Sequence, residues 1–498
     1  MKILLLEHPR NIDPERCNDI ANTPLSSCLL TGYVAGLLKS KGHEVVIVEG
    51  HLDRLTYENI EASFISFRPD ILGVHMIYHW INDIKLHNFL KKVKYEGNPP
   101  YITAYGFYPT IAYGDILHQW PVVDSVIVGE PEMTFAELVD SVSGHAVAGD
   151  IEGLAYVGRS GEITFKKREP AGELDALPFP LRTEAMLRLP EVNLQGSRGC
   201  YGSCTFCYIN PFYGNGSRWR GRNPANICEE IKGVISMHGK RDFYFTDPNF
   251  FGLGQKGQER ARLIASLLKP LNIRFGLEGR VNDIHDETIG ALAEAGLRHI
   301  LIGLESGSDR SLKRMNKMTT VAQNENAIRV LRRHGIEPNV GFIMFEPDST
   351  LDDIKVNFDF LMRNDLLKNL PVTANVLYHH QIILKGTPAY RQLKNEGRLN
   401  IQPSSTYEGV TSFTDPKVAA LAHLMRRITN FLFTRMAGIW SGKIMAPINA
   451  REKYATANQL LLKIFEESLK TLMAGHHIND EQFNAIAEET ESEMGRIL

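Results

Sequence analysis

Three cysteines, Cys200, Cys204 and Cys207, lie in one short glycine-bearing loop, with three residues between the first two and two between the last two. Thiolates this close together are metal ligands, and structural zinc or an electron-transfer cluster normally takes four protein ligands. The next cysteine in the chain is Cys228, and no histidine lies nearby. The spacing therefore predicts a metal centre with one corner left open.

This spacing, with the aromatic Phe206 just before the last cysteine, resembles the signature of the radical S-adenosylmethionine (SAM) superfamily. The resemblance implies a [4Fe-4S] cluster held by Cys200, Cys204 and Cys207, with SAM at the open iron. Electron transfer to the sulfonium would yield a 5′-deoxyadenosyl radical that removes hydrogen from an unactivated carbon. A zinc-binding module or an iron-sulfur electron carrier stays open as the alternative, and each needs a fourth ligand.

Length and composition limit the class of protein. A chain of 498 residues is long enough for about three domains. The net charge of −3 provides no positive electrostatic potential that would attract nucleic acid. Six cysteines with this spacing do not form a disulfide framework. No run approaches the roughly twenty apolar residues of a membrane span. We expect a reduced, cytoplasmic protein with no nucleic-acid partner and no membrane span.

The N-terminal third alternates short apolar runs with helical patterns. Strands are predicted over residues 2–6, 44–49, 71–76, 101–104 and 125–128, and helices over 27–41 and 80–95. This alternation predicts a doubly wound, Rossmann-like parallel sheet in residues 1–145, with ligands beyond the carboxyl ends of its strands.

Two runs at those strand ends, Tyr105-Gly106-Phe107-Tyr108-Pro109-Thr110 and Val128-Gly129-Glu130-Pro131-Glu132, resemble the cobalamin-binding domain fused to many radical SAM enzymes. The resemblance implies cobalamin contacts at Tyr78, Gly106, Tyr108, Thr110, Gly129, Glu130 and Glu132. Many such domains carry Asp-x-His-x-x-Gly after the first strand, whereas this chain has His8-Pro9-Arg10-Asn11-Ile12-Asp13. Bound cobalamin would then lack a lower axial histidine, and a domain that has lost the cofactor is the other possibility.

Residues 146–188 are irregular and rich in glycine and proline, and they are predicted to be a linker with one short strand pair. Beyond it, strands alternate with helices, and each strand ends in polar or small residues. The predicted strands are residues 192–195, 242–246, 274–277, 299–304, 340–345 and 375–383. Residues 189–405 are thus predicted to form a partial (β/α)6 TIM-like barrel whose carboxyl rim carries the site.

SAM carries an ammonium, a carboxylate, a ribose diol and adenine, so its pocket needs an acid, a base, hydroxyl partners and an apolar shelf. The superfamily resemblance places these at strand ends and implies SAM contacts at Phe206, Glu278, Arg280, Glu305, Ser306 and Lys317. Arg280 has the alternative of pairing with Asp283. Phe345-Glu346-Pro347-Asp348 replaces a glycine-bearing run of the relatives and puts a bulky side chain beside the cavity.

Apolar residues recur at helical spacing beyond about residue 405, so residues 406–498 are predicted to form a helical C-terminal domain. Cys228 lies in a predicted helix and is interpreted as a packing residue.

The resemblance to the cobalamin-fused type implies methylation of an unactivated carbon in a small-molecule biosynthetic intermediate. An external donor such as flavodoxin or ferredoxin would supply the electron. A radical SAM cyclisation, rearrangement or other SAM cleavage without methyl transfer is the nearest alternative. The sequence singles out no catalytic acid or base and names no substrate.

Overall fold

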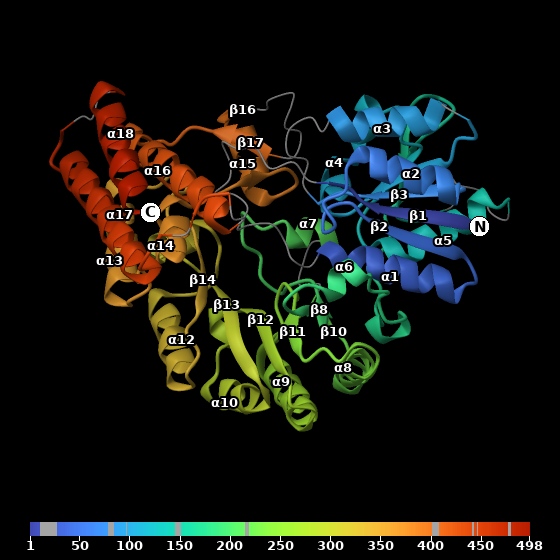
Figure 1. Ribbon diagram of the computed structural model, residues 1–498, viewed down its shortest axis with the longest axis horizontal. Coiled ribbons are helices and arrows are strands. Elements are labelled where there is room, and N and C mark those ends of the chain that lie inside the picture. Colours follow the sequence, from blue (N-terminus) through green and yellow to red (C-terminus); the bar gives the residue numbers. More distant parts are fainter. Residues whose placement is uncertain are drawn as a thin grey trace.

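The computed structural model describes residues 1–9, 27–77, 84–95, 97–144, 151–214, 219–400, 408–440, 443–445, 447–476 and 480–498. Two α/β bodies follow one another along the chain, and a group of long helices packs beside the second (Figure 1). Tyr78, one of the predicted cofactor contacts, lies outside the described residues.

The first body is a seven-stranded sheet in the order β2-β1-β3-β4-β5-β6-β7. Its parallel strands are β1 (Lys2–Glu7), β2 (Glu44–Glu49), β3 (Ile71–His75), β4 (Tyr101–Tyr105) and β5 (Ser125–Ile127). The strand pair predicted within the linker, β6 (Leu154–Val157) and β7 (Ile163–Phe165), extends this sheet in antiparallel fashion.

Helices cover both faces of that sheet, because its strands are apolar on both sides. One face packs against α1 (Ser27–Ser40) and α5 (Pro131–Val142). The other packs against α2 (Tyr57–Phe67), α3 (Ile84–Tyr95) and α4 (Phe107–Gln119). The predicted doubly wound arrangement is confirmed.

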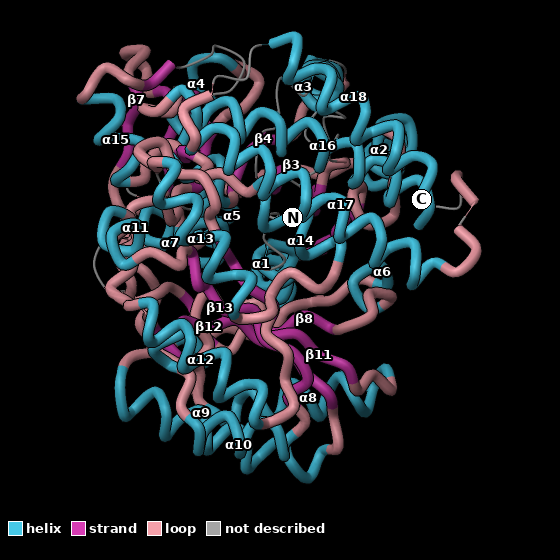
Figure 2. The backbone as a smooth tube through the Cα atoms, turned by 90° about the vertical axis from the view of Figure 1, so that its left-hand side faces the viewer, coloured by secondary structure: helices cyan, strands magenta, loops and turns pink. Residues whose placement is uncertain are grey.

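The second body is an open parallel sheet in the order β14-β13-β12-β11-β8. Its strands are β8 (Val192–Leu194), β11 (Asp242–Phe245), β12 (Arg274–Arg280), β13 (Leu297–Glu305) and β14 (Asn339–Phe342). Figure 2 shows the outer side of this sheet lined by α8 (Pro224–His238), α9 (Gly254–Leu268), α10 (Asp286–Ala295) and α12 (Val321–Arg333). A parallel bridge between Phe345 and His380 continues the sheet beyond β14.

The strand predicted over residues 375–383 is wrong. Helix α14 (Leu370–Tyr378), with Pro371 in its first turn, occupies residues 375–378, and strand β15 (Ile383–Leu384) pairs with β17 (Glu408–Thr411) in a separate antiparallel sheet. Most side chains of α14 are buried, because the helix packs between the barrel core and the C-terminal helices. A short buried run of this kind has no periodicity that separates a strand from a helix.

The predicted C-terminal helices are α16 (Pro416–Trp440), α17 (Ala450–Met473) and α18 (Asp480–Ile497). Helices α16 and α17 pack on α14 and on α13 (Leu351–Arg363), and α18 packs on α16 and α17. Their apolar side chains belong to the same buried cluster as the barrel core. In the part of the chain that the structure describes, no helix combines the length and apolar character needed to cross a membrane.

The turn after α10 gives a test of the barrel packing. Gly296 has a φ of +115°, and a Cβ there would overlap the carbonyl oxygen of Ile273. Gly335, after α12, has a φ of +72° but open space around it. We expect Gly296→Ala to lower the free energy of unfolding by about 3 kcal/mol and Gly335→Ala by about 1 kcal/mol.

Urea titration followed by circular dichroism measures both values. Equal losses in the two variants would mean that the contact with Ile273 does not constrain the barrel.

Candidate functional site

The cysteine loop leaves the barrel at the carboxyl end of β8 and is closed at its base by a small hairpin. Strand β9 (Ser197–Arg198) pairs antiparallel with β10 (Arg220–Gly221), so Arg198 lies opposite Arg220. The loop between them carries the cysteines and the short helix α7 (Ile209–Tyr213). Figure 1 places α7 between the barrel and the N-terminal sheet.

The three cysteines of this loop interact electrostatically, and Cys204 is buried while Cys200 and Cys207 are half-buried. Burial raises the pKa of the Cys207 thiol to about 12, and nearby Cys204 and Cys200 add to the shift. Arg280 Nη1 donates to Cys204 Sγ at 3.4 Å, and the amide of Gly202 donates to Cys200 Sγ at 3.3 Å. A cation and an amide aimed at the sulfurs suit an anionic cluster.

Such a cluster differs from a single-ion site in its ligand geometry. Among the described residues, no three His, Cys, Asp or Glu side chains are grouped as ligands of one ion. A four-iron cluster needs no such convergence, because each cysteine binds a different iron. Cys228 is buried on α8, and its thiol donates to the carbonyl of Leu267 at 3.8 Å, which fits the predicted packing role.

Three of the predicted SAM contacts form one connected group beside Cys204. Arg280, at the end of β12, donates through Nη2 to the backbone carbonyl of Lys317, and its guanidinium lies 5.3 Å from the ring centre of Tyr201. Lys317 Nζ is 2.7 Å from Glu305 Oε1, and both residues are buried. Gly303 leaves room for this pair, because a Cβ there would lie 2.5 Å from Glu305 Oε1 and 2.6 Å from Lys317 Nζ.

The alternative partner of Arg280 is otherwise engaged. Asp283 accepts from the Tyr201 hydroxyl at 2.7 Å and from Asn249 Nδ2 at 3.1 Å. The structure therefore directs Arg280 to the cysteine loop, with Asp283 supporting Tyr201 behind it.

Glu278 points to the same face of β12 as Arg280, since the two residues are two positions apart on the strand. Its Oε1 accepts from the Tyr244 hydroxyl at 3.3 Å. Burial raises the pKa of Glu278 to about 7, and the nearby charge of Asp247 adds to this rise. A half-neutral carboxyl at this place becomes fully ionised when a cation binds beside it.

The remaining two predicted SAM contacts are placed differently. The side chain of Ser306 is fully buried, and its Oγ donates to Asn357 Oδ1 on α13 at 2.7 Å. This hydroxyl thus holds the loop after β13 against α13. Phe206 is partly exposed within the cysteine loop.

Several predicted cobalamin contacts come together at the carboxyl ends of β4 and β5. Thr110 Oγ1 donates to the carbonyl of Gly106 at 2.7 Å and accepts from the amide of Gly129 at 2.9 Å. Gly106 and Gly129 both have positive φ, at +115° and +86°. Tyr108 is buried on the first turn of α4. Two glycine-bearing loops are thereby joined into one surface.

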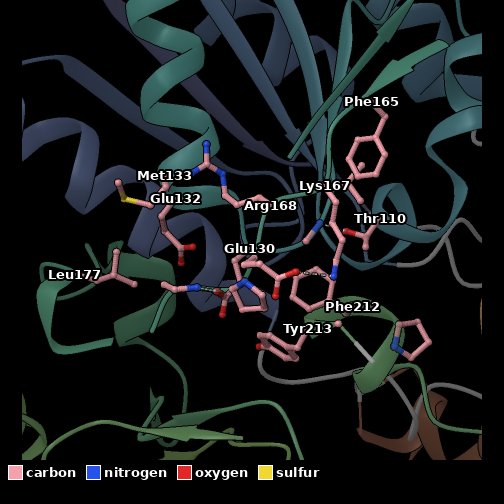
Figure 3. A pocket seen from close by; sticks show the side chains of 17 residues that line it. Thr110, Glu130, Glu132, Met133, Phe165, Lys167, Arg168, Leu177, Phe212 and Tyr213 are labelled. Carbon is pink, nitrogen blue, oxygen red and sulfur yellow. Dashed lines mark hydrogen bonds and ion pairs between the residues drawn. The ribbon is translucent and has the colours of Figure 1, made fainter. Parts of the chain in front are cut away.

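That surface faces the cysteine loop. The ring of Phe107 lies 4.2 Å from that of Phe212 and 5.0 Å from that of Tyr208, measured between ring centres. A cavity of about 180 Å³ opens beside this contact, and Figure 3 shows Thr110 and Glu130 on its walls together with Phe212 and Tyr213 of α7. The carboxyl ends of both parallel sheets thus converge on one region.

Glu130 and Glu132 are bound by arginines that the sequence reading did not single out. Arg198 Nη2 is 2.6 Å from Glu132 Oε1, and Arg220 Nη2 is 2.7 Å from Glu130 Oε1. Arg198 precedes the first cysteine by two positions, and that closeness was the one signal available in the sequence.

A buried carboxylate–histidine pair was also missed. His75, the last residue of β3, donates or accepts through Nδ1 at 2.7 Å from Glu7 Oε1, and its ring stacks on Tyr105 at 5.1 Å. Its Nε2 has no hydrogen-bond partner within the described residues. His8 is buried and lies 2.9 Å from the carbonyl of Pro9 through Nδ1.

A three-cysteine loop at the carboxyl rim of an open α/β barrel, with an Arg, a Lys and two Glu beside it, defines a class of proteins that pair an iron-sulfur cluster with SAM. Residues 194–361 match the sequence model of the Radical SAM superfamily. The matched residues make up most of the barrel that carries the cysteine loop, so this barrel is a radical SAM domain.

Known proteins resemble the chain over most of its length. An uncharacterized methyltransferase of Pyrococcus horikoshii is 26% identical over 377 residues, covering 74% of this chain and 79% of the relative. The anaerobic magnesium-protoporphyrin IX monomethyl ester cyclase of Rubrivivax gelatinosus is 28% identical over 341 residues, covering 66% of this chain and 60% of the relative.

Two solved structures share the fold. The cobalamin-dependent SAM radical enzyme OxsB with aqua-cobalamin superimposes with a TM-score of 0.81 at 20% identity, covering 100% of this chain and 80% of that one. The radical SAM methyltransferase TsrM of Kitasatospora setae, with cobalamin and a [4Fe-4S] cluster, gives 0.64 at 15% identity, covering 81% and 76%. The fold is that of cobalamin-dependent radical SAM enzymes.

The raised pKa of Glu278 predicts a pH-dependent stability. The folded protein holds a proton up to about pH 7 that an unfolded chain releases near pH 4.3. The resulting stabilisation is present below pH 4 and is lost as the pH rises through 7. Glu278→Gln, which stays neutral, is therefore expected to exceed the wild type in unfolding free energy by about 3 kcal/mol at pH 8 and by only about 1 kcal/mol at pH 5.

Urea midpoints at the two pH values measure this difference. Glu294→Gln, an exposed change on α10, is the control and is expected to behave alike at both. A Glu278→Gln curve that parallels the wild type at pH 5 and pH 8 would contradict the assignment.

Proposed function

We propose that the protein is a cobalamin-dependent radical SAM enzyme that methylates an unactivated carbon of a small molecule. The observation that carries the proposal is the convergence of the two sheets. The cysteine loop, with Arg280 and Lys317 beside it, lies against the glycine-bearing ends of β4 and β5 through Phe107, Phe212 and Tyr208. A substrate between them would reach both cofactors.

The cluster would be held by Cys200, Cys204 and Cys207, and SAM by the charged groups next to them. Glu278 would take the ammonium, because a neighbouring cation draws its pKa down from about 7. Lys317 and Arg280 are the cations within reach of the carboxylate, and Phe206 offers an apolar surface for adenine. The bound cluster supplies an electron to the sulfonium of SAM, and an external donor such as flavodoxin or ferredoxin restores it.

Cobalamin would contact the surface joined by Thr110, namely Gly106, Tyr108 and Gly129, with Tyr78 as a further predicted contact. Bound cobalamin supplies the methyl group. Glu130 and Glu132 are left out of this proposed contact set, since their carboxylates bind Arg198 and Arg220.

The lower face of the cofactor would lack a histidine ligand. The first loop has no Asp-x-His-x-x-Gly run. The side chain of His75 is directed to Glu7 and stacked on Tyr105, and that of His8 is near the carbonyl of Pro9.

A cyclase-type oxidation is the second candidate, because relatives named as magnesium-protoporphyrin IX monomethyl ester cyclases match a similar share of the chain. The two candidates differ in what SAM becomes. Methylation consumes one SAM to give S-adenosylhomocysteine and a second to give 5′-deoxyadenosine. Cyclisation without methyl transfer gives only 5′-deoxyadenosine.

Cysteine variants test the cluster. After anaerobic reconstitution, Cys200→Ala, Cys204→Ala and Cys207→Ala are each expected to lose most of the bound iron and all 5′-deoxyadenosine formation, because a three-ligand site has no spare thiolate. Cys228→Ala is expected to keep both. Iron analysis, the absorption spectrum and chromatography of SAM products measure these outcomes.

Loss of the cluster in Cys228→Ala would favour a four-ligand electron carrier. Wild-type protein that forms 5′-deoxyadenosine but never S-adenosylhomocysteine, with cobalamin and reductant supplied, would favour the cyclase-type reaction.

Electron paramagnetic resonance tests whether a histidine coordinates the lower face of the cobalamin. Cob(II)alamin bound to the protein is expected to show no nitrogen superhyperfine splitting of its cobalt lines, because no imidazole coordinates it. A triplet that turns into a doublet when the protein is grown with ¹⁵N-histidine would contradict this and would make His75, with its unpartnered Nε2, the residue to replace. A triplet insensitive to labelling would indicate the cofactor's own base.

A further inference from the structure

The base of the cysteine loop brings two like charges together. Arg198 and Arg220 are direct cross-strand partners in the β9–β10 hairpin. Like charges in that position repel and destabilise the pairing. The barrel segment that closes the loop therefore needs negative charge from elsewhere.

That charge comes from the N-terminal body. Glu130 Oε1 is 3.3 Å from Arg198 Nη1 and 2.7 Å from Arg220 Nη2, so one carboxylate bridges both arginines. Glu132 Oε1 adds a second contact to Arg198 at 2.6 Å. Glu130 stands immediately before α5, and Glu132 lies in its first turn.

Three members of the assembly are shielded from water, since Arg198 is 1% exposed, Glu132 2% and Glu130 9%. The side chain of Arg220 is 15% exposed. The guanidinium of Arg198 lies 4.9 Å from the ring centre of Tyr33 on α1, and that of Arg220 lies 5.7 Å from Tyr213 on α7. Removing one partner of a buried pair leaves an uncompensated charge, which is much more costly than losing a surface pair.

The remaining carboxylate oxygen of Glu130 is also occupied. Glu130 Oε2 accepts from the amide of Ala171 at 2.9 Å and from Arg220 Nη1 at 3.0 Å. Arg198 is fixed from the barrel side as well, since its Nε donates to Gln195 Oε1 at 2.9 Å. Both carboxylate oxygens of Glu130 are thus engaged by the hairpin and the segment beside it.

We propose that Glu130 and Glu132 are positioning residues that hold the base of the cysteine loop closed and thereby place Cys200, two residues beyond Arg198. Docking of the N-terminal body neutralises the hairpin. As far as it concerns the cluster, this inference rests on the proposed function.

The first test needs no cluster. Hydrogen–deuterium exchange of the full-length apo protein is followed in peptides from residues 199–214. Glu132→Gln and Glu130→Gln are expected to raise the exchange rate there by about tenfold or more, because an uncompensated buried arginine opens the hairpin. The matched control is Glu137→Gln on the same helix α5, which removes the partly exposed pair with Arg168 and is expected to leave these peptides unchanged.

The second test uses the reconstituted holoprotein. The rate at which an iron chelator removes the cluster under anaerobic conditions is expected to rise at least about fivefold in Glu132→Gln, while binding of added hydroxocobalamin stays as in the wild type. The double variant Glu132→Gln/Arg198→Met removes both charges of one pair and is expected to recover slower exchange and slower iron loss. Recovery separates a charge effect from general damage to the fold.

Several results would overturn the inference. Unchanged exchange in both glutamate variants would do so, as would equal acceleration in Glu137→Gln or a double variant no better than Glu132→Gln. Loss of cobalamin with an intact, slowly released cluster would instead make these glutamates cofactor contacts. Wild-type protein that assembles no cluster would refute the proposed function, and the exchange experiment would still decide whether the hairpin is held as described.

Discussion

The structure depends on a set of buried charges at the boundary between its two α/β bodies. Arg198 and Arg220 belong to the barrel, and Glu130 and Glu132 belong to the N-terminal body. The two glutamates neutralise the positive charge of the two arginines, and the arginines in turn neutralise the negative charge of the glutamates. Buried ion pairs contribute little net stability but penalise any arrangement that separates them. The ion pairs therefore determine how the two bodies are placed relative to each other and add little to the stability of the interface. The stabilising contribution comes from the apolar contacts of Phe107 with Phe212 and Tyr208.

This placement would let one region serve the two cofactors of the proposed reaction. In an open parallel sheet, ligands bind beyond the carboxyl ends of the strands. Two such sheets usually face separate ligands. In this protein the carboxyl ends of β4 and β5 face the loop that follows β8 (Figure 1). The polar groups from the two sides, with Arg280 and Lys317 on one and the Thr110 hydrogen bonds on the other, then border a common region.

The sequence was sufficient for the architecture because its signals are local. Hydrophobic runs and the cysteine spacing both report on neighbouring residues. The prediction failed at residues 375–378, where a mostly buried helix leaves no clear helical period in the sequence. It also could not place Ser306, whose hydroxyl turns to Asn357, or Arg198, whose partners lie more than sixty positions away. Contacts set by the tertiary arrangement leave no trace in a single sequence unless a family resemblance supplies it.

The helices α16, α17 and α18 share one continuous apolar interior with the barrel through α13 and α14. A segment integrated in this way unfolds together with the catalytic body instead of behaving as a detachable lid. Exchange of the whole C-terminal region between related enzymes would therefore expose barrel surface and reduce yield.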